Sequence, residues 1–183
     1  MLDVGTGTGA VALAAARRGA AKVTAVDVSA RAVLAARANA MMRGLRLRVL
    51  RGDLFRPVAG EVFDVILANP PYVVGERGRG LPRRGKDRAW EGGPEGRLIL
   101  DQICAQAPAH LAPGGTLLIV QSALSGVEAS LRALRRSGLR ASVVARRSEP
   151  FGPVMLARAA SLEARGLIQP GQRTEELVVI RAC

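Results

Sequence analysis

Four consecutive residues, Asn69, Pro70, Pro71 and Tyr72, could hold a planar NH2 group for reaction at its nitrogen. The side-chain oxygen of Asn69 and the backbone carbonyl of Pro70 are two acceptors, and the prolines fix φ and remove nearby donors. Two adjacent acceptors can bind both hydrogens of an amide or exocyclic amine and draw the lone pair out of conjugation. Tyr72 offers a flat face for stacking. The alternative is a plain turn, because Asn-Pro often begins one.

A glycine-rich segment near the start of the chain could receive a ligand. Gly5, Gly7 and Gly9 follow Asp3, and glycine lets a backbone turn sharply and approach a ligand closely. Their spacing differs from the G-x-G-x-x-G turn, which places a pyrophosphate at a helix N-terminus. S-adenosylmethionine has no phosphate, so its amino-acid portion would lie over this loop, with its cationic end facing Asp3. Alone, the loop could also be a tight strand-to-helix turn.

Two further carboxylates stand where neighbouring strands are expected to end. Asp27 follows the apolar segment 23–26, at a position where α/β sheets place a carboxylate on ribose hydroxyls. Asp53 could accept a hydrogen bond from an adenine amino group, with Leu54 against the ring. Either aspartate alone could be a loop carboxylate or a helix cap. Three acidic residues in this order, each at a strand end, favour a ligand that contains a nucleoside.

Along almost its whole length the sequence resembles the class I S-adenosylmethionine-dependent methyltransferases, and Asn69 to Tyr72 resembles the tetrapeptide of the amino-methyltransferases. The resemblance implies an enzyme that uses S-adenosylmethionine and no metal. The reaction would be a direct displacement on sulfonium, in which positioning supplies most of the acceleration. The implied catalytic residues are Asn69, Pro70 and Tyr72. The implied cofactor-binding residues are Asp3, Gly5, Gly7, Gly9, Asp27, Asp53, Leu54 and Asn69.

The segment from Ala89 to Arg97 narrows the resemblance to the HemK-like glutamine methyltransferases, because Trp90 precedes an acidic residue and paired glycines. It is most similar to the eukaryotic and archaeal branch, which lacks the N-terminal helical domain of the bacterial enzymes. The implied substrate is a glutamine in the Gly-Gly-Gln loop of a release factor. The alternative for this segment is a Gly/Pro hinge ahead of a helix. In the eukaryotic branch a small zinc-binding partner covers a sheet edge, although the segment 45–50, with Arg46 and Arg48, could form an edge without one.

Other functions stay open at this point. A planar NH2 group is also found on adenine and guanine, so an adenine-N6 or guanine-N2 methyltransferase of rRNA or DNA is the main alternative. A small-molecule N-methyltransferase is a third possibility. An inactive cofactor- or ribosome-binding module is a fourth, and the intact Asn69 and Tyr72 argue against it.

Strand-like and helix-like segments alternate, which predicts a doubly wound, mostly parallel seven-stranded sheet in one Rossmann-like domain over residues 1–183. The chain begins inside the first expected strand, so we expect elements at the N-terminal edge to be missing. Ser29 is the expected N-cap of the second helix. The expected strands are 2–4, 23–26, 45–50, 62–68, 116–121, 139–147 and 177–181. The expected helices are 10–18, 29–43, 97–110, 127–137 and 158–165. Pro113 to Gly115 is expected to be a turn, 73–95 a long functional loop, and 149–155 either part of the substrate pocket or a cover for the sheet.

The composition fits a folded globule with a basic surface. The chain has 183 residues, a hydrophobic fraction of 49% and a formal charge of +12. The charge suggests contact with a ribosome or RNA, although 25 arginines against two lysines could also reflect coding bias. Cys104 and Cys183 lack the spacing of a disulfide framework or a metal site, and no stretch is apolar for long enough to span a membrane. We therefore expect a cytoplasmic protein. His110 lies far from the tetrapeptide in sequence, where a surface or core role is expected.

Overall fold

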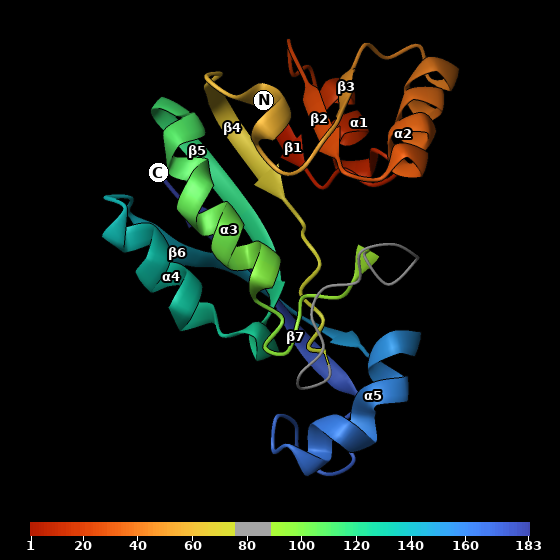
Figure 1. Ribbon diagram of the computed structural model, residues 1–183, viewed down its shortest axis with the longest axis vertical. Coiled ribbons are helices and arrows are strands. Elements are labelled where there is room, and N and C mark those ends of the chain that lie inside the picture. The colour runs from red at the N-terminus through yellow and green to blue at the C-terminus, as the bar shows by residue number, and fades with distance from the viewer. Residues whose placement is uncertain (76–88) are drawn as a thin grey trace.

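The computed structural model describes residues 1–75 and 89–183. Within them, seven strands form one sheet in the order β3-β2-β1-β4-β5-β7-β6 (Figure 1). The strands are β1 (Leu2–Val4), β2 (Thr24–Asp27), β3 (Arg48–Arg51), β4 (Phe63–Ala68), β5 (Leu111–Ser122), β6 (Ala141–Pro150) and β7 (Thr174–Ala182). The helices are α1 (Ala10–Arg17), α2 (Ala30–Met42), α3 (Leu98–Gln106), α4 (Val127–Arg136) and α5 (Pro153–Ala164), with short 3-10 turns η1 (Arg56–Val58), η3 (Ala107–His110) and η4 (Ala123–Ser125).

The predicted mostly parallel α/β sheet is confirmed. β3, β2, β1, β4 and β5 pair in parallel, whereas β7 runs antiparallel to both β5 and β6. Because β7 is antiparallel to β5, the start of β7 lies at the same edge of the sheet as the C-terminal ends of the parallel strands.

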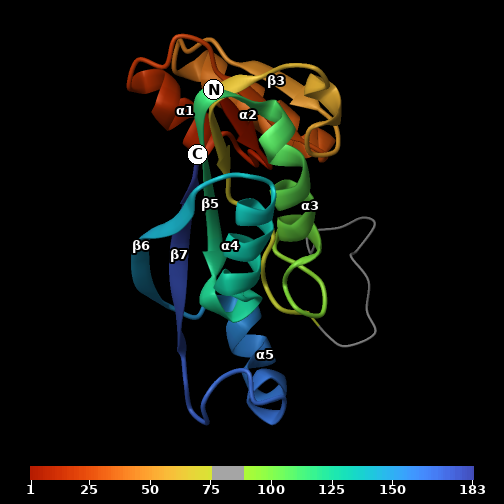
Figure 2. The ribbon, with the colours of Figure 1, turned by 90° about the vertical axis from the view of Figure 1, so that its left-hand side faces the viewer.

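Helices cover the two faces of the sheet separately. Along β2, Ala25 packs with residues of α1 and α2, whereas the next residue, Val26, packs in the cluster that contains residues of α3 and α4. Because side chains alternate along a strand, α1 and α2 lie on one face and α3 and α4 on the other. Figure 2 shows α3 and α4 side by side against β5 and β7.

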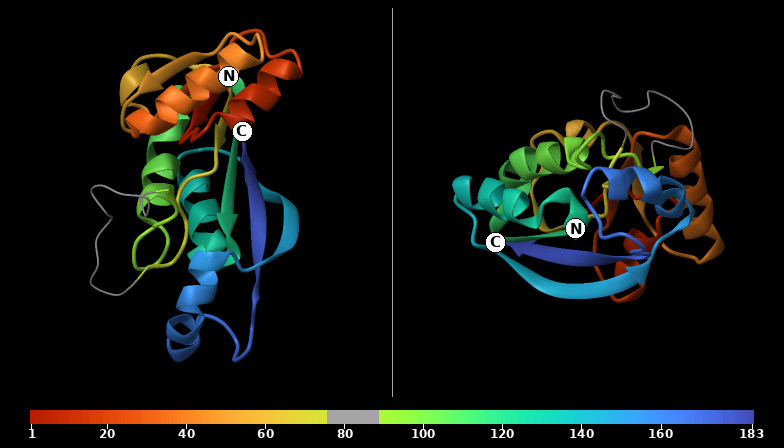
Figure 3. Two further views of the ribbon diagram at one scale, coloured as in Figure 1. Left: turned by 90° about the vertical axis from the view of Figure 1, so that its right-hand side faces the viewer. Right: turned by 90° about the horizontal axis from the view of Figure 1, so that it is seen from below.

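A third apolar cluster lies around α5, at the end of the molecule away from α1 and α2 (Figure 3). Val74, which follows β4 in the chain, packs there with Phe151, Met155 and Leu162. The segment after β4 is therefore anchored to an element about eighty residues later in the sequence. No helix in the described ranges is long and apolar enough to cross a bilayer.

Local sequence signals explain the helix boundaries in the first half. The Ser29 hydroxyl accepts a hydrogen bond from the Ala32 amide (3.3 Å), which confirms the predicted N-cap of α2. Gly19 and Gly44 follow the ends of α1 and α2 with positive φ, as expected of residues that stop helices.

Several other boundaries were predicted wrongly. α5 begins at Pro153 rather than Arg158, since proline is favoured at the first position of a helix, where its missing N–H costs nothing. β5 begins at Leu111, and the expected turn at 113–115 is a bulge within it, where the register to β4 shifts between Phe63 and Val65. β3 is shorter than expected, and β7 begins three residues earlier than expected, at Thr174.

Candidate functional site

The residues predicted to bind a ligand gather at one edge of the sheet. The glycine loop follows β1, Asp27 ends β2, Asp53 follows β3 and Asn69 follows β4. These four strands are direct neighbours in the sheet, so their C-terminal ends lie together. The structure therefore brings all the predicted site residues to one rim.

Asp27 connects the glycine loop to the start of α2. One of its carboxylate oxygens accepts a hydrogen bond from the Gly7 amide and the other from the Ser29 amide, both at 2.8 Å. Gly5 and Gly7 have φ of +73° and +56°, and a Cβ at either would meet nothing within 4 Å. Backbone conformation rather than crowding therefore requires glycine there. The space over the loop is free among the described residues.

Asp3 is almost completely buried beneath this loop. Its Oδ2 accepts hydrogen bonds from the Thr6 hydroxyl (2.6 Å) and the Ala12 amide (3.1 Å). Burial raises the pKa of Asp3 above its ordinary value, the two hydrogen bonds lower it, and the charge of Asp27 raises it slightly. The described role of Asp3 is to organise the loop, and its contact with a ligand stays a prediction.

The turn after β3 contains an unusual backbone conformation. Leu54 has a φ of +44° and is the one non-glycine residue with positive φ in the described ranges. Side chains are disfavoured there by about 1–2 kcal/mol, and such strain often marks functional sites. The turn is tight, because a Cβ on Gly52 would lie 2.1 Å from a Pro57 ring carbon. Asp53 is exposed beside Leu54, as a ligand contact requires.

The tetrapeptide after β4 is fixed by elements that follow it in the chain. The Asn69 side chain is exposed, whereas Pro70 is buried and Tyr72 is half-buried. The Tyr72 carbonyl accepts a hydrogen bond from the Ser125 hydroxyl (2.8 Å), and Gly96 packs directly against it. A Cβ on Gly96 would lie 2.3 Å from the Tyr72 oxygen, so only glycine fits. The backbone that carries Asn69 and Pro70 is therefore held rigidly.

A pocket of about 220 Å³ opens beside the tetrapeptide. The Trp90 segment forms one wall, held by hydrogen bonds from the Val73 amide to the Trp90 carbonyl and from the Gly92 amide to the Val73 carbonyl (both 2.9 Å). The start of α5 and the start of β7 supply the rest. The lining residues are Asn69, Pro70, Pro71, Tyr72, Val73, Ala89, Trp90, Gly152, Pro153, Val154, Met155 and Glu175. The segment 149–155 was expected either to form part of the substrate pocket or to cover the sheet, and residues 152–155 line the pocket.

Two arginines, Arg158 within α5 and Arg165 at its C-cap, attach this helix to the segments that follow β4 and Trp90. Arg158 donates to the Val74 carbonyl (2.8 Å) and forms an ion pair with Glu91 (2.6 Å), next to Trp90. Arg165 donates to the carbonyls of Gly75 (2.7 Å) and Pro94 (2.8 Å). These contacts were not predicted, although a spacing of seven residues places the two arginines on one helix face. Most of the long loop expected at 73–95, residues 76–88, lies outside the described residues.

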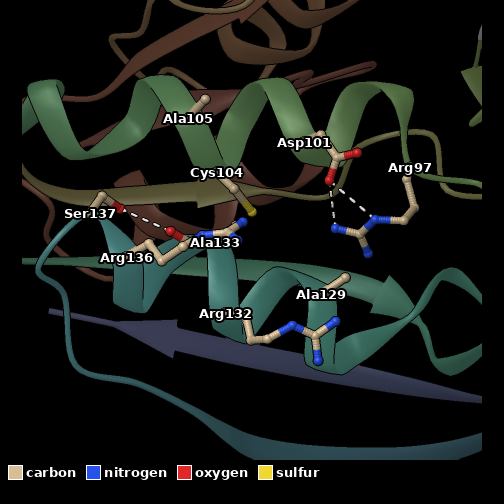
Figure 4. Close-up of a pocket in the computed structure, with 9 residues that line it drawn as sticks. All are labelled: Arg97, Asp101, Cys104, Ala105, Ala129, Arg132, Ala133, Arg136 and Ser137. Carbon is tan, nitrogen blue, oxygen red and sulfur yellow. Dashed lines mark hydrogen bonds and ion pairs between the residues drawn. The ribbon is translucent and has the colours of Figure 1, made fainter.

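A second hollow, of about 610 Å³, lies between α3 and α4 (Figure 4). Arg97 lines it but is engaged with Asp101 and with the carbonyls of Ser125 and Gly126. Burial raises the pKa of Cys104, which also lines it, to about 11, so the thiol is a poor nucleophile. His110 stacks on Phe55 (4.8 Å between ring centroids), contacts the Glu61 carbonyl and lines neither this hollow nor the pocket. We assign no chemistry to any of these residues.

Comparison with known proteins shows that the chain is similar to methyltransferases. Residues 1–80 match the family model described as methyltransferase small domain. The chain is 35% identical over 159 residues to a protein of Methanocaldococcus jannaschii that is provisionally named a protein N5-glutamine methyltransferase, and the match covers 87% of this chain and 80% of that protein. It is 41% identical over 123 residues to the release factor glutamine methyltransferase of Deinococcus radiodurans, covering 65% of this chain and 44% of that protein. The chain thus spans less than half of the bacterial relative.

Among solved structures, the E. cuniculi Mtq2–Trm112 complex has a similar fold, with a TM-score of 0.65 at 21% identity. The match covers 99% of this chain and 82% of that chain. The complex is described as responsible for methylation of the eRF1 translation termination factor. At this identity the similarity concerns the fold alone.

Proposed function

Because the chain belongs to the class I methyltransferase family that includes the protein N5-glutamine methyltransferases, we propose that it methylates the side-chain amide nitrogen of a glutamine in a protein. The observation that carries this proposal is the pair of acceptors at the mouth of the pocket. The exposed Asn69 side chain and the carbonyl of the neighbouring, buried Pro70 stand beside Tyr72 and Trp90. Such a pair matches the two hydrogens of a planar NH2 group.

S-adenosylmethionine is the proposed methyl donor, bound across the rim from Asp3 to Leu54. The free space over Gly5 and Gly7 suits its amino-acid portion. Asp27 stands at the end of β2 for the ribose hydroxyls, and Asp53 and Leu54 at the next strand end for adenine. The strained backbone of Leu54 supports a ligand contact at that position. When bound, the donor supplies a methyl carbon on a positively charged sulfur.

The residues of the tetrapeptide would bind and orient the amide. Asn69 and Pro70 accept its two N–H hydrogens, which concentrates the lone pair on nitrogen and aims it at the methyl carbon. The carbon–nitrogen bond forms as the carbon–sulfur bond breaks, and the nitrogen then loses one proton to solvent. Tyr72 stacks on the planar amide. Fixing this geometry supplies most of the acceleration, so the site needs no separate base.

The charge of the pocket supports a protein over a nucleic acid as substrate. Among its described lining residues Glu175 is the one charged side chain, and it is acidic. A carboxylate beside the reacting group would repel a phosphate backbone. We therefore propose a translation release factor as the substrate, which also implies a cytoplasmic protein. Residues 1–183 would act as one domain, and the basic surface, with its charge of +12, would serve contact with the ribosome.

A methyl-transfer assay with labelled S-adenosylmethionine tests this proposal. A release factor, a Gly-Gly-Gln peptide, ribosomes and DNA are offered side by side. We expect label on the glutamine of the release factor and the peptide. Label on nucleic acid alone would refute the glutamine assignment.

The variant Asn69→Ala tests the role of the acceptor pair. We expect turnover to fall by about 100-fold or more, as when one positioned hydrogen-bonding group is removed from an active site. Calorimetry should show an affinity for S-adenosylmethionine within about fivefold of the wild type, since the remaining predicted contacts are intact. A loss of cofactor binding that accounts for the whole loss of turnover would show that Asn69 acts through the cofactor alone and does not hold the amide.

A further inference from the structure

Glu175, the second residue of β7, has a side chain that the proposed reaction does not use. Its Oε2 atom is buried and has no hydrogen-bond partner among the residues that the structure describes. It is the one buried side-chain oxygen or nitrogen in those ranges without a partner. A buried, unpaired acceptor costs about 1–3 kcal/mol, so such a group calls for an explanation.

The Glu175 side chain faces the substrate pocket. Side chains alternate along a strand, and the next residue, Glu176, lies on the opposite face, where it pairs with Arg146 in an exposed ion pair. Glu175 instead lines the pocket with Asn69 and Tyr72. Burial raises the pKa of Tyr72, and the negative charge of Glu175 raises it further, which indicates that the two side chains are close.

Nearby arginines are already engaged elsewhere. Arg158 pairs with Glu91, and Arg173 pairs with Glu163. On β6, the strand partner of Glu175 is Glu149, which pairs with Arg147. Within the described part of the chain, no cation forms an ion pair with Glu175, and its buried oxygen is available to a donor from a bound molecule.

We propose that Glu175 is a specificity-determining residue, which accepts a hydrogen bond from an N–H group of the polypeptide next to the methylated glutamine. The inference rests on the proposed glutamine methylation. A peptide fits this role because it carries N–H donors on both sides of the glutamine. Apart from Asn69 and Glu175, the described side chains that line the pocket are aromatic or apolar. The donor is a main-chain amide or the cationic side chain of a flanking residue, and both satisfy the same acceptor.

The test compares Glu175→Gln with wild-type enzyme on a Gly-Gly-Gln peptide. Glutamine keeps the size of the side chain but removes its charge and replaces one acceptor oxygen with an NH2 donor. The hydrogen bond from the peptide is therefore weakened, and we expect KM for the peptide to rise about tenfold or more. We expect kcat and the affinity for S-adenosylmethionine to stay within about twofold, because Glu175 lies outside the cofactor rim and does not touch the reacting nitrogen. Glu176→Gln is the matched control, and its KM should be that of the wild type.

Two modified peptides identify the donor. If the donor is a main-chain amide, N-methylating the amides that flank the glutamine should raise KM for the wild type but not raise it further for Glu175→Gln. If the donor is a side chain, replacing a flanking basic residue of the peptide should raise KM for the wild type but not raise it further for Glu175→Gln. If the wild type methylates the peptide and Glu175→Gln has an unchanged KM, the inference about Glu175 is overturned and the proposed function stands. Wild type that labels no glutamine would overturn the proposed function and, with it, the inference.

Discussion

Asp3 is a carboxylate in a position where its charge is unfavourable for folding. Its burial outweighs the hydrogen bonds from Thr6 and Ala12, so its pKa in the folded chain lies above the ordinary value of 3.8. The folded state therefore holds a proton on Asp3 to a higher pH than the unfolded state does. Folding stability then falls as the pH rises from about the unfolded pKa through the raised folded pKa. Asp3 therefore lowers folding stability when it is ionised, and it lies under the loop that is predicted to bind the ligand. This combination fits a binding role, because functional residues often lower stability.

The variant Asp3→Asn should separate stability from binding. Asparagine cannot ionise, but its oxygen can still accept the Thr6 and Ala12 hydrogen bonds. We expect the free energy of unfolding of the variant, relative to wild type, to increase as the pH rises through this window and to level off above it. Urea denaturation of both proteins between pH 4 and pH 8 measures the difference. Affinity for S-adenosylmethionine should fall at the same time, because the cation loses its counter-charge.

The control for this prediction is Thr6→Val. It removes a hydrogen bond that lowers the pKa of Asp3, so its stability should go on falling to a higher pH than that of the wild type. A difference between Asp3→Asn and wild type that stays flat or shrinks with rising pH would contradict the argument.

At the residue scale, the sequence predicted those site residues that lie at the C-terminal ends of parallel strands. Asp27, Asp53 and Asn69 could be placed together because each follows a predicted parallel strand, and such strand ends meet at one edge. Glu175 could not be placed, because it stands at the start of a strand and nothing in the local pattern gives the direction of β7. The strain at Leu54 was likewise invisible, since it depends on the turn closing against Pro57.

Among the elements, α5 links segments on the substrate side of the site that lie far apart in the sequence. Arg158 joins it to both walls of the pocket, through the Val74 carbonyl and the Glu91 carboxylate. The side chains of Arg158 and Glu91 are only 22% and 11% exposed, so this ion pair is largely shielded from water. Removing one partner of such a pair leaves the other charge poorly compensated.

The variant Arg158→Ala should loosen the Trp90 segment. We expect it to lower the free energy of unfolding by about 2 kcal/mol, part of the cost of breaking a fully buried pair. Amide exchange at Gly92 should become faster, since its hydrogen bond to Val73 depends on the position of this segment. KM for a glutamine peptide should rise more than the dissociation constant of S-adenosylmethionine.

The exposed pair between Arg146 and Glu176 provides a matched comparison, with side chains 54% and 43% exposed. Arg146→Ala should cost less than about 1 kcal/mol, because water screens such a pair. Equal losses in the two variants would show that the burial of the Arg158 pair has no energetic importance.

At the element scale, the sequence predicted type and order better than boundaries. The first helices carry clear stop signals at Gly19 and Gly44, and their positions were predicted to within two residues. The start of α5 was missed because Gly152 and Pro153 indicate a turn, whereas a proline can also begin a helix. The ion pairs of α5 with the pocket walls depend on tertiary packing, which local patterns do not reveal.

The whole molecule carries a charge of +12, while the pocket beside the tetrapeptide is lined by a carboxylate. The two features act over different distances. The net charge attracts a polyanion to the surface, largely screened beyond about 10 Å at 0.1 M salt. The carboxylate acts on the group that enters the pocket. Binding of RNA and methylation of RNA are therefore separate properties.

We expect the protein to bind RNA without methylating it. For about four phosphate contacts, affinity for a single-stranded RNA should fall roughly 50-fold between 50 and 200 mM salt. Fluorescence anisotropy measures the affinity, and the labelled-methyl assay at the lower concentration should find no label on the RNA. A salt-independent affinity together with labelled RNA would instead indicate base recognition in the pocket.

The place of β7 in the sheet means that the two halves of the site are completed at different times during synthesis. β7 is the last of the seven strands along the chain, yet it inserts between β5 and β6. During synthesis, the strands that present Asp27, Asp53 and Asn69 leave the ribosome long before the residues that complete the sheet. A growing chain could therefore fold its cofactor-binding rim early and gain its substrate pocket only once β7 has emerged, so the ability to bind the donor would precede the ability to use it.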